Sequence, residues 1–238
     1  MELMRRRSQL YFFEGEKLVR DVLQRRQSVQ KLLVLDECRS DFAQSIDQAE
    51  EFWVVNAAVM AKVSGLRSPP VCLAVLEGLE RTIDFDRHRI VLVLDAIQDP
   101  ANLGSAFRCA AAFGIDAVAV SGSGVAPSNP KFVRTAQTAL LDVPFQRFDH
   151  LMDLITAARR REWHVFLTSS QPLKNTVTVD EVTPPCLLVL GNEGRGLDRK
   201  LLSQFPAIRL AQSERLDSLN VGVSACILMY ELHRRRQS

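Results

Sequence analysis

The chain has 238 residues, of which 47% are hydrophobic and 24% are charged, and its formal net charge at pH 7 is +2. This is the composition of an ordinary globular protein, and it excludes a disordered, collagen-like or coiled-coil chain. The charges are too evenly balanced to indicate nucleic-acid binding by themselves.

The chain carries no signal for a membrane, for export or for a metal. Its longest largely apolar stretch, Leu219 to Tyr230, is shorter than the roughly 18 residues of a spanning helix. The basic residues Arg5 to Arg7 are not followed by the apolar segment and cleavage site of an export signal. The five cysteines include no Cys-x-x-Cys pair, which indicates reduced thiols rather than disulfides or a zinc site. We therefore expect a soluble, cytoplasmic protein with no metal and no membrane partner.

Arginine dominates the basic residues, because only six of the 30 are lysines. Several arginines are clustered, as at Arg159 to Arg161 and at Arg234 to Arg236. The planar guanidinium presents a fork of donors that suits phosphate. Arginine-rich codon usage would give the same bias without any function, and both explanations stay open.

The first eighty residues alternate short strands with helices. The pattern predicts strands at 9–13, 29–35, 52–55 and 71–76, and helices at 14–25, 41–50 and 57–63. The charged segment Glu77 to Arg89 has little apolar periodicity, which is typical of a linker between two cores. We place a small α/β domain with its linker at residues 1–87 and a second domain at residues 88–238.

The alternation is clearer after the linker. The pattern predicts strands at 90–97, 117–121, 164–168 and 187–190, and helices at 103–113, 130–140, 151–161 and 220–234. Strands that are continuous runs of Val, Leu and Ile, alternating with helices, predict a parallel sheet covered on both faces. The fold class is therefore α/β, and a ligand is expected at the carboxyl ends of the strands.

The loop after Ile97 runs from Asp99 to Arg108 into a predicted helix. Asn102 is a natural N-cap and Pro100 a natural stop, so the end of a strand and the start of a helix explain both residues. They do not explain Arg108, which lies on a helix that otherwise consists of Ala, Phe and Cys. Such small neighbours would let a substrate or a partner backbone come close.

The loop after Leu190 runs from Gly191 to Leu197 and has three glycines in six residues, whereas a simple turn needs one. It is neither a P-loop nor a dinucleotide fingerprint. A carboxylate at Glu193 among backbone amides indicates an ordered loop around a ligand, and a structural cap is the alternative. Ser218 and Asn220 open the last helix, and a helix cap explains each of them when it is considered alone.

Together and in this order, the three segments resemble the SpoU or TrmH family of RNA ribose 2′-O-methyltransferases, which use S-adenosyl-L-methionine (SAM). The family motifs are Asn-x-Gly-x-x-x-Arg, Gly-x-Glu-Gly-x-Gly and Ser-Leu-Asn-Val. The front segments, Glu14 to Val19 and Val71 to Leu76, are similar to the small RNA-binding domain of many members. The residues that match the motifs are Asn102, Gly104 and Arg108; Gly191, Glu193, Gly194 and Gly196; and Ser218 to Val221.

The resemblance implies a trefoil knot in the C-terminal half, with the last helix threaded through a loop, although knots are rare in proteins. It also implies a homodimer whose interface includes the last helix, and SAM held bent in the knot mainly by backbone groups. In place of the family's Ile-Pro-Met-x-Gly segment, this chain has Leu210 to Glu214. The residues that the resemblance assigns to SAM are Thr168, Gly191, Gly194, Ile208, Leu210 and Leu219.

The resemblance assigns Arg108 to the ribose hydroxyl that is methylated. Deprotonating a guanidinium at pH 7 would cost about 7–9 kcal/mol. Our hypothesis is therefore that Arg108 stabilises the developing alkoxide, oriented by Ser218 and Asn220. Asn102 and Glu193 would fix the loops, and the identity of the general base stays open.

The implied function is 2′-O-methylation of structured RNA, with ribosomal RNA favoured over transfer RNA because a front domain is present to select it. Two other classes stay open. A non-catalytic RNA-binding or ribosome-assembly factor on the same fold would not bind SAM. A small-molecule enzyme on an unknotted sheet would not bind RNA.

Overall fold

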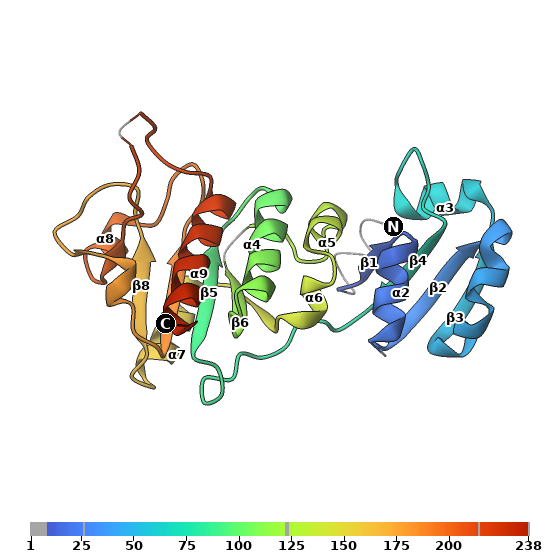
Figure 1. Cartoon of the computed structure of the whole chain (residues 1–238), viewed down its shortest axis with the longest axis horizontal. Helices are drawn as coiled ribbons and strands as arrows, with labels where there is room; N and C mark the ends of the chain where they lie inside the picture. Colours follow the sequence, from blue (N-terminus) through green and yellow to red (C-terminus); the bar gives the residue numbers. More distant parts are fainter. Residues whose placement is uncertain (1–8, 26, 122–123, 214, 238) are drawn as a thin grey trace. The chain divides into compact units, whose positions relative to one another are not determined.

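A computed structural model of the chain describes residues 9–25, 27–121, 124–213 and 215–237. Arg5 to Arg7 and Glu214, which the sequence analysis singled out, lie outside these residues. The chain folds into two compact units, whose elements are labelled in Figure 1. The first unit contains residues 1–79 and 126–138, and the second contains residues 80–125 and 139–238. The chain therefore enters the first unit twice.

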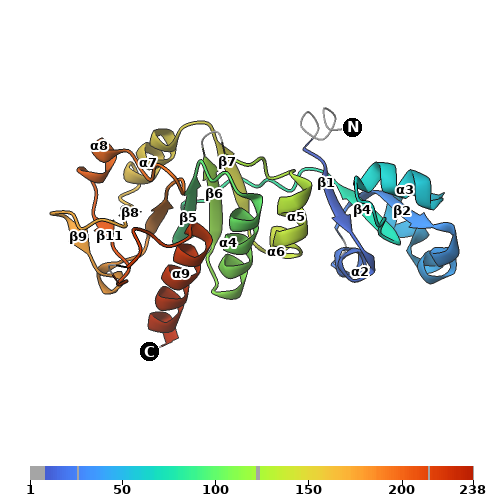
Figure 2. The ribbon, with the colours of Figure 1, turned by 90° about the horizontal axis from the view of Figure 1, so that it is seen from above.

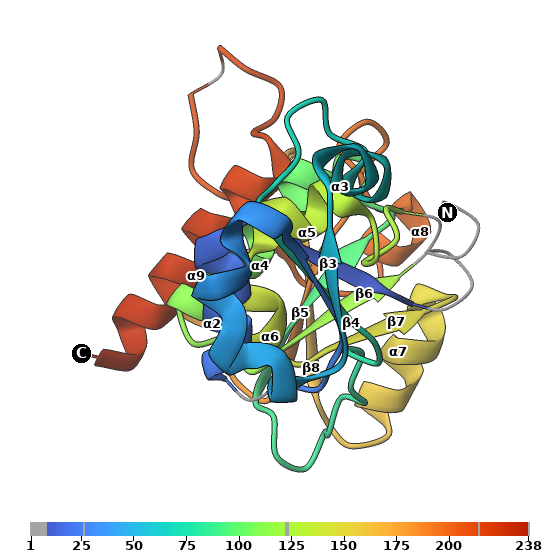
Figure 3. The ribbon, with the colours of Figure 1, turned by 90° about the vertical axis from the view of Figure 1, so that its right-hand side faces the viewer.

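The first unit is built on a four-stranded sheet with the strand order β1-β4-β2-β3. Strands β2 and β3 are parallel, and the other pairs are antiparallel. Figure 3 shows α2 and α3 on opposite sides of this sheet. The elements are β1 Tyr11–Glu14, α2 Glu16–Gln24, β2 Val29–Leu35, the 3-10 helix η1 Asp36–Gln48, β3 Ala49–Val55, α3 Ala57–Ser64, β4 Cys72–Leu76 and, from later in the chain, α5 Pro130–Ala136.

The core of the first unit follows from the alternation of side chains along its strands. Met60 of α3 packs on one face of the sheet, against residues such as Phe12 and Leu33. Helix α5 packs along β1, a strand at the edge of the sheet, and its Phe132 and Val133 are fully buried.

The second unit is built on a seven-stranded sheet with the order β7-β6-β5-β10-β8-β11-β9, in which every pair is parallel. Figure 2 shows α4 and α9 on one face of the sheet and α7 on the other. Because both faces are covered, β10 is buried along its whole length, as its continuous apolar run requires. The predicted α/β fold with a parallel sheet is confirmed.

The elements of the second unit lie between residues 90 and 237. They are β5 Ile90–Asp95, α4 Pro100–Ala112, β6 Ala117–Ser121, α6 Ala139–Asp142, β7 Phe145–Phe148, α7 Leu151–Arg159, β8 His164–Thr168, β9 Thr176–Val177, the 3-10 helix η2 Val179–Glu181, β10 Cys186–Leu190, α8 Arg199–Leu202, β11 Ala207–Ile208 and α9 Val221–Gln237.

Some elements differ from the prediction. The segment 41–50, predicted as an α-helix, lies mostly in the 3-10 helix η1, and the Ser and Asp residues of this segment have weak α-helix propensity. The helix predicted at 130–140 is broken between α5 and α6, because Gln137 has a φ of +54°. Strands β7, β9 and β11 were not predicted, since they have only two to four residues each.

Candidate active site

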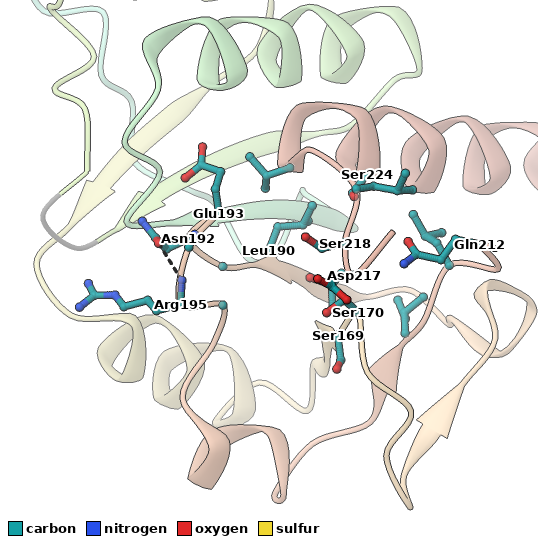
Figure 4. Close-up of a pocket in the computed structure, with 18 residues that line it drawn as sticks. Ser169, Ser170, Leu190, Asn192, Glu193, Arg195, Gln212, Asp217, Ser218 and Ser224 are labelled. Carbon is teal, nitrogen blue, oxygen red and sulfur yellow. Dashed lines mark hydrogen bonds between the residues drawn. The ribbon is translucent and has the colours of Figure 1, made fainter. Parts of the chain in front are cut away.

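A pocket of about 350 Å³ lies at the carboxyl end of the parallel sheet (Figure 4). It is formed by the loops that follow β8, β10 and β11 and by the segment that leads into α9. Its volume is in the range of small-molecule sites. All the residues that the resemblance assigns to SAM line it, namely Thr168, Gly191, Gly194, Ile208, Leu210 and Leu219.

The glycine-rich loop after β10 is held by Asn192, in line with the structural cap that was the alternative for this loop. The Oδ1 atom of Asn192 accepts hydrogen bonds from the backbone amides of Gly194, at 2.9 Å, and Arg195, at 3.2 Å. Its Nδ2 atom donates to the carbonyl of Ala96 at 2.9 Å, which ties the loop to the end of β5. The sequence signal for this role is an asparagine at the start of a glycine-rich turn, because asparagine side chains commonly accept hydrogen bonds from the amides two and three residues later.

The first glycine of this loop has no space for a side chain. A Cβ atom on Gly191 would lie 2.7 Å from Leu197 Cγ and 2.8 Å from the carbonyl carbon of Gly196. Such contacts are closer than packed carbon atoms allow. Gly196 is favoured by its backbone conformation and not by a lack of space. Its φ of +66° lies in the left-handed region that residues with a side chain rarely adopt.

Side-chain hydrogen bonds join the three sequence motifs. Asn102 Nδ2 donates to Glu193 Oε1 at 3.0 Å, and Asn220 Nδ2 donates to Asn102 Oδ1 at 2.9 Å. Asn220 Oδ1 also accepts from the backbone amides of Gly222 and Val223, so the same side chain caps α9. Residues from α4, from the glycine-rich loop and from the start of α9 therefore form one connected network.

The expectation that Asn102 caps its helix is wrong. The N-cap of α4 is Asp99, whose Oδ1 atom accepts from the backbone amide of Ala101 at 2.9 Å. Pro100 occupies the first helical position, where its missing N–H costs nothing. Asn102 thus lies inside the first turn, and its side chain is free to bind Glu193.

Two further predicted site residues, Arg108 and Ser218, share no hydrogen bond in the described part of the chain. Ser218 lines the pocket, whereas Arg108 does not. Arg108 is exposed on α4 and makes no hydrogen bond or ion pair with any other residue in the described part of the chain. Within a single copy, the amide of Asn220 is directed to Asn102. The expected arrangement of Ser218 and Asn220 around Arg108 is therefore absent from one chain.

Carboxylates dominate the charge at the pocket. Glu193 and Asp217 both line it, and Arg195 contributes a cation at its edge. In Figure 4 the side chain of Arg195 is directed away from Ser218 and Gln212. The pocket thus suits a ligand that carries positive charge near its centre.

The thiol beside Arg108 is unsuited to act as a base. Burial and, after it, a hydrogen bond with Cys226 raise the pKa of Cys109 to about 12. Cys109 is therefore protonated at neutral pH.

The described residues show neither a metal site nor a membrane-spanning helix. They include no group of three or more His, Cys, Asp and Glu side chains that could hold a metal ion. Nor do they include a helix both long and apolar enough to cross a membrane.

Comparison with protein families gives matches in both halves of the sequence. Residues 89–230 match the model of the SpoU rRNA Methylase family. Residues 3–74 match the model of the MRM3-like substrate binding domain.

Individual relatives match nearly the whole chain. The 23S rRNA (guanosine(2553)-2′-O)-methyltransferase RlmP of Bacillus subtilis is 31% identical over 232 residues, which cover 96% of this chain and 90% of that protein. The crystal structure of AdoMet-bound rRNA methyltransferase from Sinorhizobium meliloti has a TM-score of 0.83 and 25% identity, covering 99% of this chain and 91% of that one. A putative RNA methyltransferase of the TrmH family from Porphyromonas gingivalis gives a TM-score of 0.81 at 25% identity, covering 99% of this chain and 94% of that one.

Proposed function

The chain belongs to the SpoU rRNA methylase family, and from this premise we propose that it is a SAM-dependent RNA (ribose-2′-O)-methyltransferase that acts on ribosomal RNA. One observation carries the proposal within the structure: the hydrogen bonds from Glu193 through Asn102 to Asn220. They hold three separate segments together beside a pocket of the right size for a small ligand.

The choice of ribosomal over transfer RNA rests on coverage. RlmP, whose name describes a 23S rRNA methyltransferase, aligns with 96% of the chain, including the front unit. A structure described as giving insights into methylation of C/U34 on tRNA matches 62% of the chain, with a TM-score of 0.57 and 26% identity. The relative that is named for ribosomal RNA thus aligns with the front unit as well, whereas the match to the structure named for tRNA leaves more than a third of the chain unmatched.

The residues of the pocket fit SAM. Its walls combine backbone groups of the glycine-rich loop with the apolar side chains of Leu190, Ile208 and Leu219, which suit an adenosine. The carboxylates of Glu193 and Asp217 suit the positive charge of a sulfonium. When bound, SAM supplies a methyl group that is open to attack by the ribose 2′-oxygen.

The protein's own part in the reaction is to align the ribose and stabilise charge. Asn102 and Glu193 fix the α4 loop against the glycine-rich loop, so that the substrate oxygen is held in line with the methyl group. The guanidinium of Arg108 stabilises the negative charge that develops on the ribose oxygen as its hydroxyl proton passes to solvent water. Ser218 lines the pocket, and in this proposal it hydrogen bonds the ribose or the Arg108 of a second copy.

Because Arg108 does not line the pocket of its own chain, we propose that it acts on the pocket of a second copy in a homodimer. The surface of α9 supports this arrangement. Helix α9 packs on α4, which carries Arg108, and exposes the apolar side chains Val223, Ile227 and Tyr230. An apolar face of this kind on a helix favours burial against a partner.

The two predicted domains have separate roles in this proposal. We propose that the domain at residues 1–87 selects the RNA and that the domain at residues 88–238 transfers the methyl group, with α9 threaded in a trefoil knot. The match of residues 3–74 to a substrate binding domain supports the first role. A ribosomal RNA substrate supports a location in the cytoplasm.

The test has two parts. Calorimetry should give saturable binding of SAM at one site per chain, and tritium from methyl-labelled SAM should transfer to unmodified ribosomal RNA. Mapping of 2′-O-methyl groups in cells with and without the gene should then show one position lost. Absence of SAM binding would contradict the proposal and favour an assembly factor on the same fold.

A further inference from the structure

A second cavity, of about 700 Å³, lies beside the SAM pocket in the same unit. One wall is the loop after β8, and the other runs from the end of the glycine-rich loop through α8. Thr168, Ser169 and Ser170 line both this cavity and the SAM pocket, so the two spaces are neighbours. The proposed reaction assigns no ligand to this second space.

The charge of the second cavity is opposite to that of the pocket. Lys174, Arg195 and Arg199 line it, and no carboxylate is among the described residues that do so. All three cations are exposed, and none forms an ion pair with another described residue. Other exposed cations of the unit, such as Arg147 and Arg160, also have no ion pair among the described residues, so what sets these three apart is that they line one cavity together. Three unpaired cations around a hollow attract an anion.

The cavity also has an apolar side and a fixed wall. Leu173, Leu197 and Leu202 line it, and Leu197 is buried. Asn175 Nδ2 donates to the carbonyls of Leu202, at 2.8 Å, and Phe205, which ties the loop after β8 to α8. The cavity is therefore a built hollow with cations at its rim and leucines inside.

We propose that this cationic cavity binds a nucleotide of the substrate RNA that neighbours the methylated one, an inference that rests on the proposed function. The phosphate would contact Lys174, Arg195 and Arg199, and the ribose or base would pack on the leucines. SAM itself does not suit the cavity, because its net charge is positive. The cavity shares Thr168, Ser169 and Ser170 with the SAM pocket, so an RNA whose 2′-oxygen reaches that pocket would pass a neighbouring nucleotide along the same wall.

The test uses the full chain with Lys174 and Arg199 both replaced by Gln. Arg195 is kept because it also lines the SAM pocket. Binding to an unmodified ribosomal RNA transcript should weaken about tenfold. The slope of log K against log salt should fall by about 1.4, since each contact to single-stranded RNA contributes about 0.7. The dissociation constant for SAM should stay unchanged, and the KM for RNA should rise more than kcat falls.

A matched control replaces Arg89 and Arg147 by Gln, two exposed cations of the same unit that do not line the cavity. It should bind RNA like the wild type. The charge-preserving variant K174R/R199K should recover most of the affinity that K174Q/R199Q loses.

The outcomes separate this inference from the proposed function. If the wild type methylates ribosomal RNA but K174Q/R199Q binds it as tightly as the control does, the inference is overturned and the proposed function stands. A parallel loss of SAM affinity would overturn the inference by making the cavity part of the SAM site. A wild type that methylates no RNA would overturn both.

Discussion

At the scale of single residues, Gly191 and Gly194 occupy the same loop in different surroundings. A Cβ atom on Gly191 would lie 2.7 Å from Leu197 Cγ, whereas one on Gly194 would lie 3.4 Å from Asn192 Oδ1, an ordinary contact. We expect Gly191→Ala to lower the free energy of unfolding by about 1–3 kcal/mol, as overpacking does. It should also weaken SAM binding, because Leu197 or the loop must move.

The matched variant for this prediction is Gly194→Ala, measured by urea unfolding and SAM calorimetry in parallel. It should unfold within about 0.5 kcal/mol of the wild type, since glycine-to-alanine changes without strain are small. Equal effects of the two substitutions would show that the contact at Leu197 does not limit the loop.

Arg108 offers a test of side-chain geometry at constant charge. Arg108→Lys keeps the positive charge but loses the planar fork of donors. We expect the methyl-transfer rate to fall about a hundredfold, the usual effect of removing a donor to a developing oxyanion, while SAM still binds. Single-turnover transfer to ribosomal RNA measures the effect. Turnover near that of the wild type would refute the role of the guanidinium fork.

The sequence predicted which residues meet at the site better than it predicted how they meet. The motif positions of Asn102, Glu193 and Asn220 were enough to predict that the three residues lie close together. Each of them follows a buried strand or begins a helix, and such positions meet at one edge of the sheet. The cap of α4 was missed because Asp99 and Asn102 are both good caps, and Pro100 decides between them by its preference for the first helical position. Asp217 was missed as a pocket residue, since loop geometry places it there.

At the scale of elements, an ion pair fastens helix α5 to strand β1. Arg134 Nη1 lies 2.7 Å from Glu14 Oε2, and the side chain of Glu14 is only 3% exposed. The other carboxylate oxygen of Glu14 is buried and has no hydrogen-bond partner among the residues that the structure describes. Arg134 is therefore the main compensation for the charge of Glu14.

Removing this arginine should destabilise the fold. Loss of one partner from a buried pair costs about 3–5 kcal/mol, and because Arg134 is 36% exposed we expect a smaller loss, about 2–3 kcal/mol, for Arg134→Met. Urea unfolding measures the change. The control is Arg20→Met, which breaks the exposed pair with Glu16 and should cost less than about 1 kcal/mol. Similar losses in both variants would contradict the role of burial.

The sequence was a good guide to elements with a long apolar run and a poor guide to short ones. Strand β10 was predicted because five buried residues in succession leave no alternative. The break between α5 and α6 was not predicted, because nothing in the residues around Gln137 marks a positive φ. Strand β7 has two adjacent polar residues, Gln146 and Arg147, between its phenylalanines, so it lacks the alternation of apolar and polar residues that predicts a strand.

At the scale of the whole molecule, the proposed homodimer can be broken at α9. Ile227→Asp should give a monomer in sedimentation equilibrium, because a charge would be buried in the interface. Methyl transfer should fall with the dimer, since Arg108 could no longer reach a second pocket. Met152→Asp is the control, because Met152 is a 49% exposed apolar side chain on α7, which covers the opposite face of the sheet. A dimer that survives Ile227→Asp would contradict the proposed interface.

The overall architecture was predictable from the rhythm of strands and helices, and the assignment of segments to units was not. The parallel sheet follows from buried strands alternating with helices. Helix α5 contacts β1 although Glu14 and Arg134 are about 120 positions apart in the sequence. Local sequence patterns do not predict a contact over such a separation. The threading of α9 stays a prediction of the resemblance.

The double passage of the chain through the first unit limits how this protein can be divided. A gene fragment that starts at residue 88 would still encode α5 but would lack β1, the strand on which it packs. Phe132 and Val133, fully buried in the intact chain, would then face water and make the fragment prone to aggregate. Recombination that swapped the front part for another specificity would have to supply a matching edge strand, so the two parts are constrained to be inherited together.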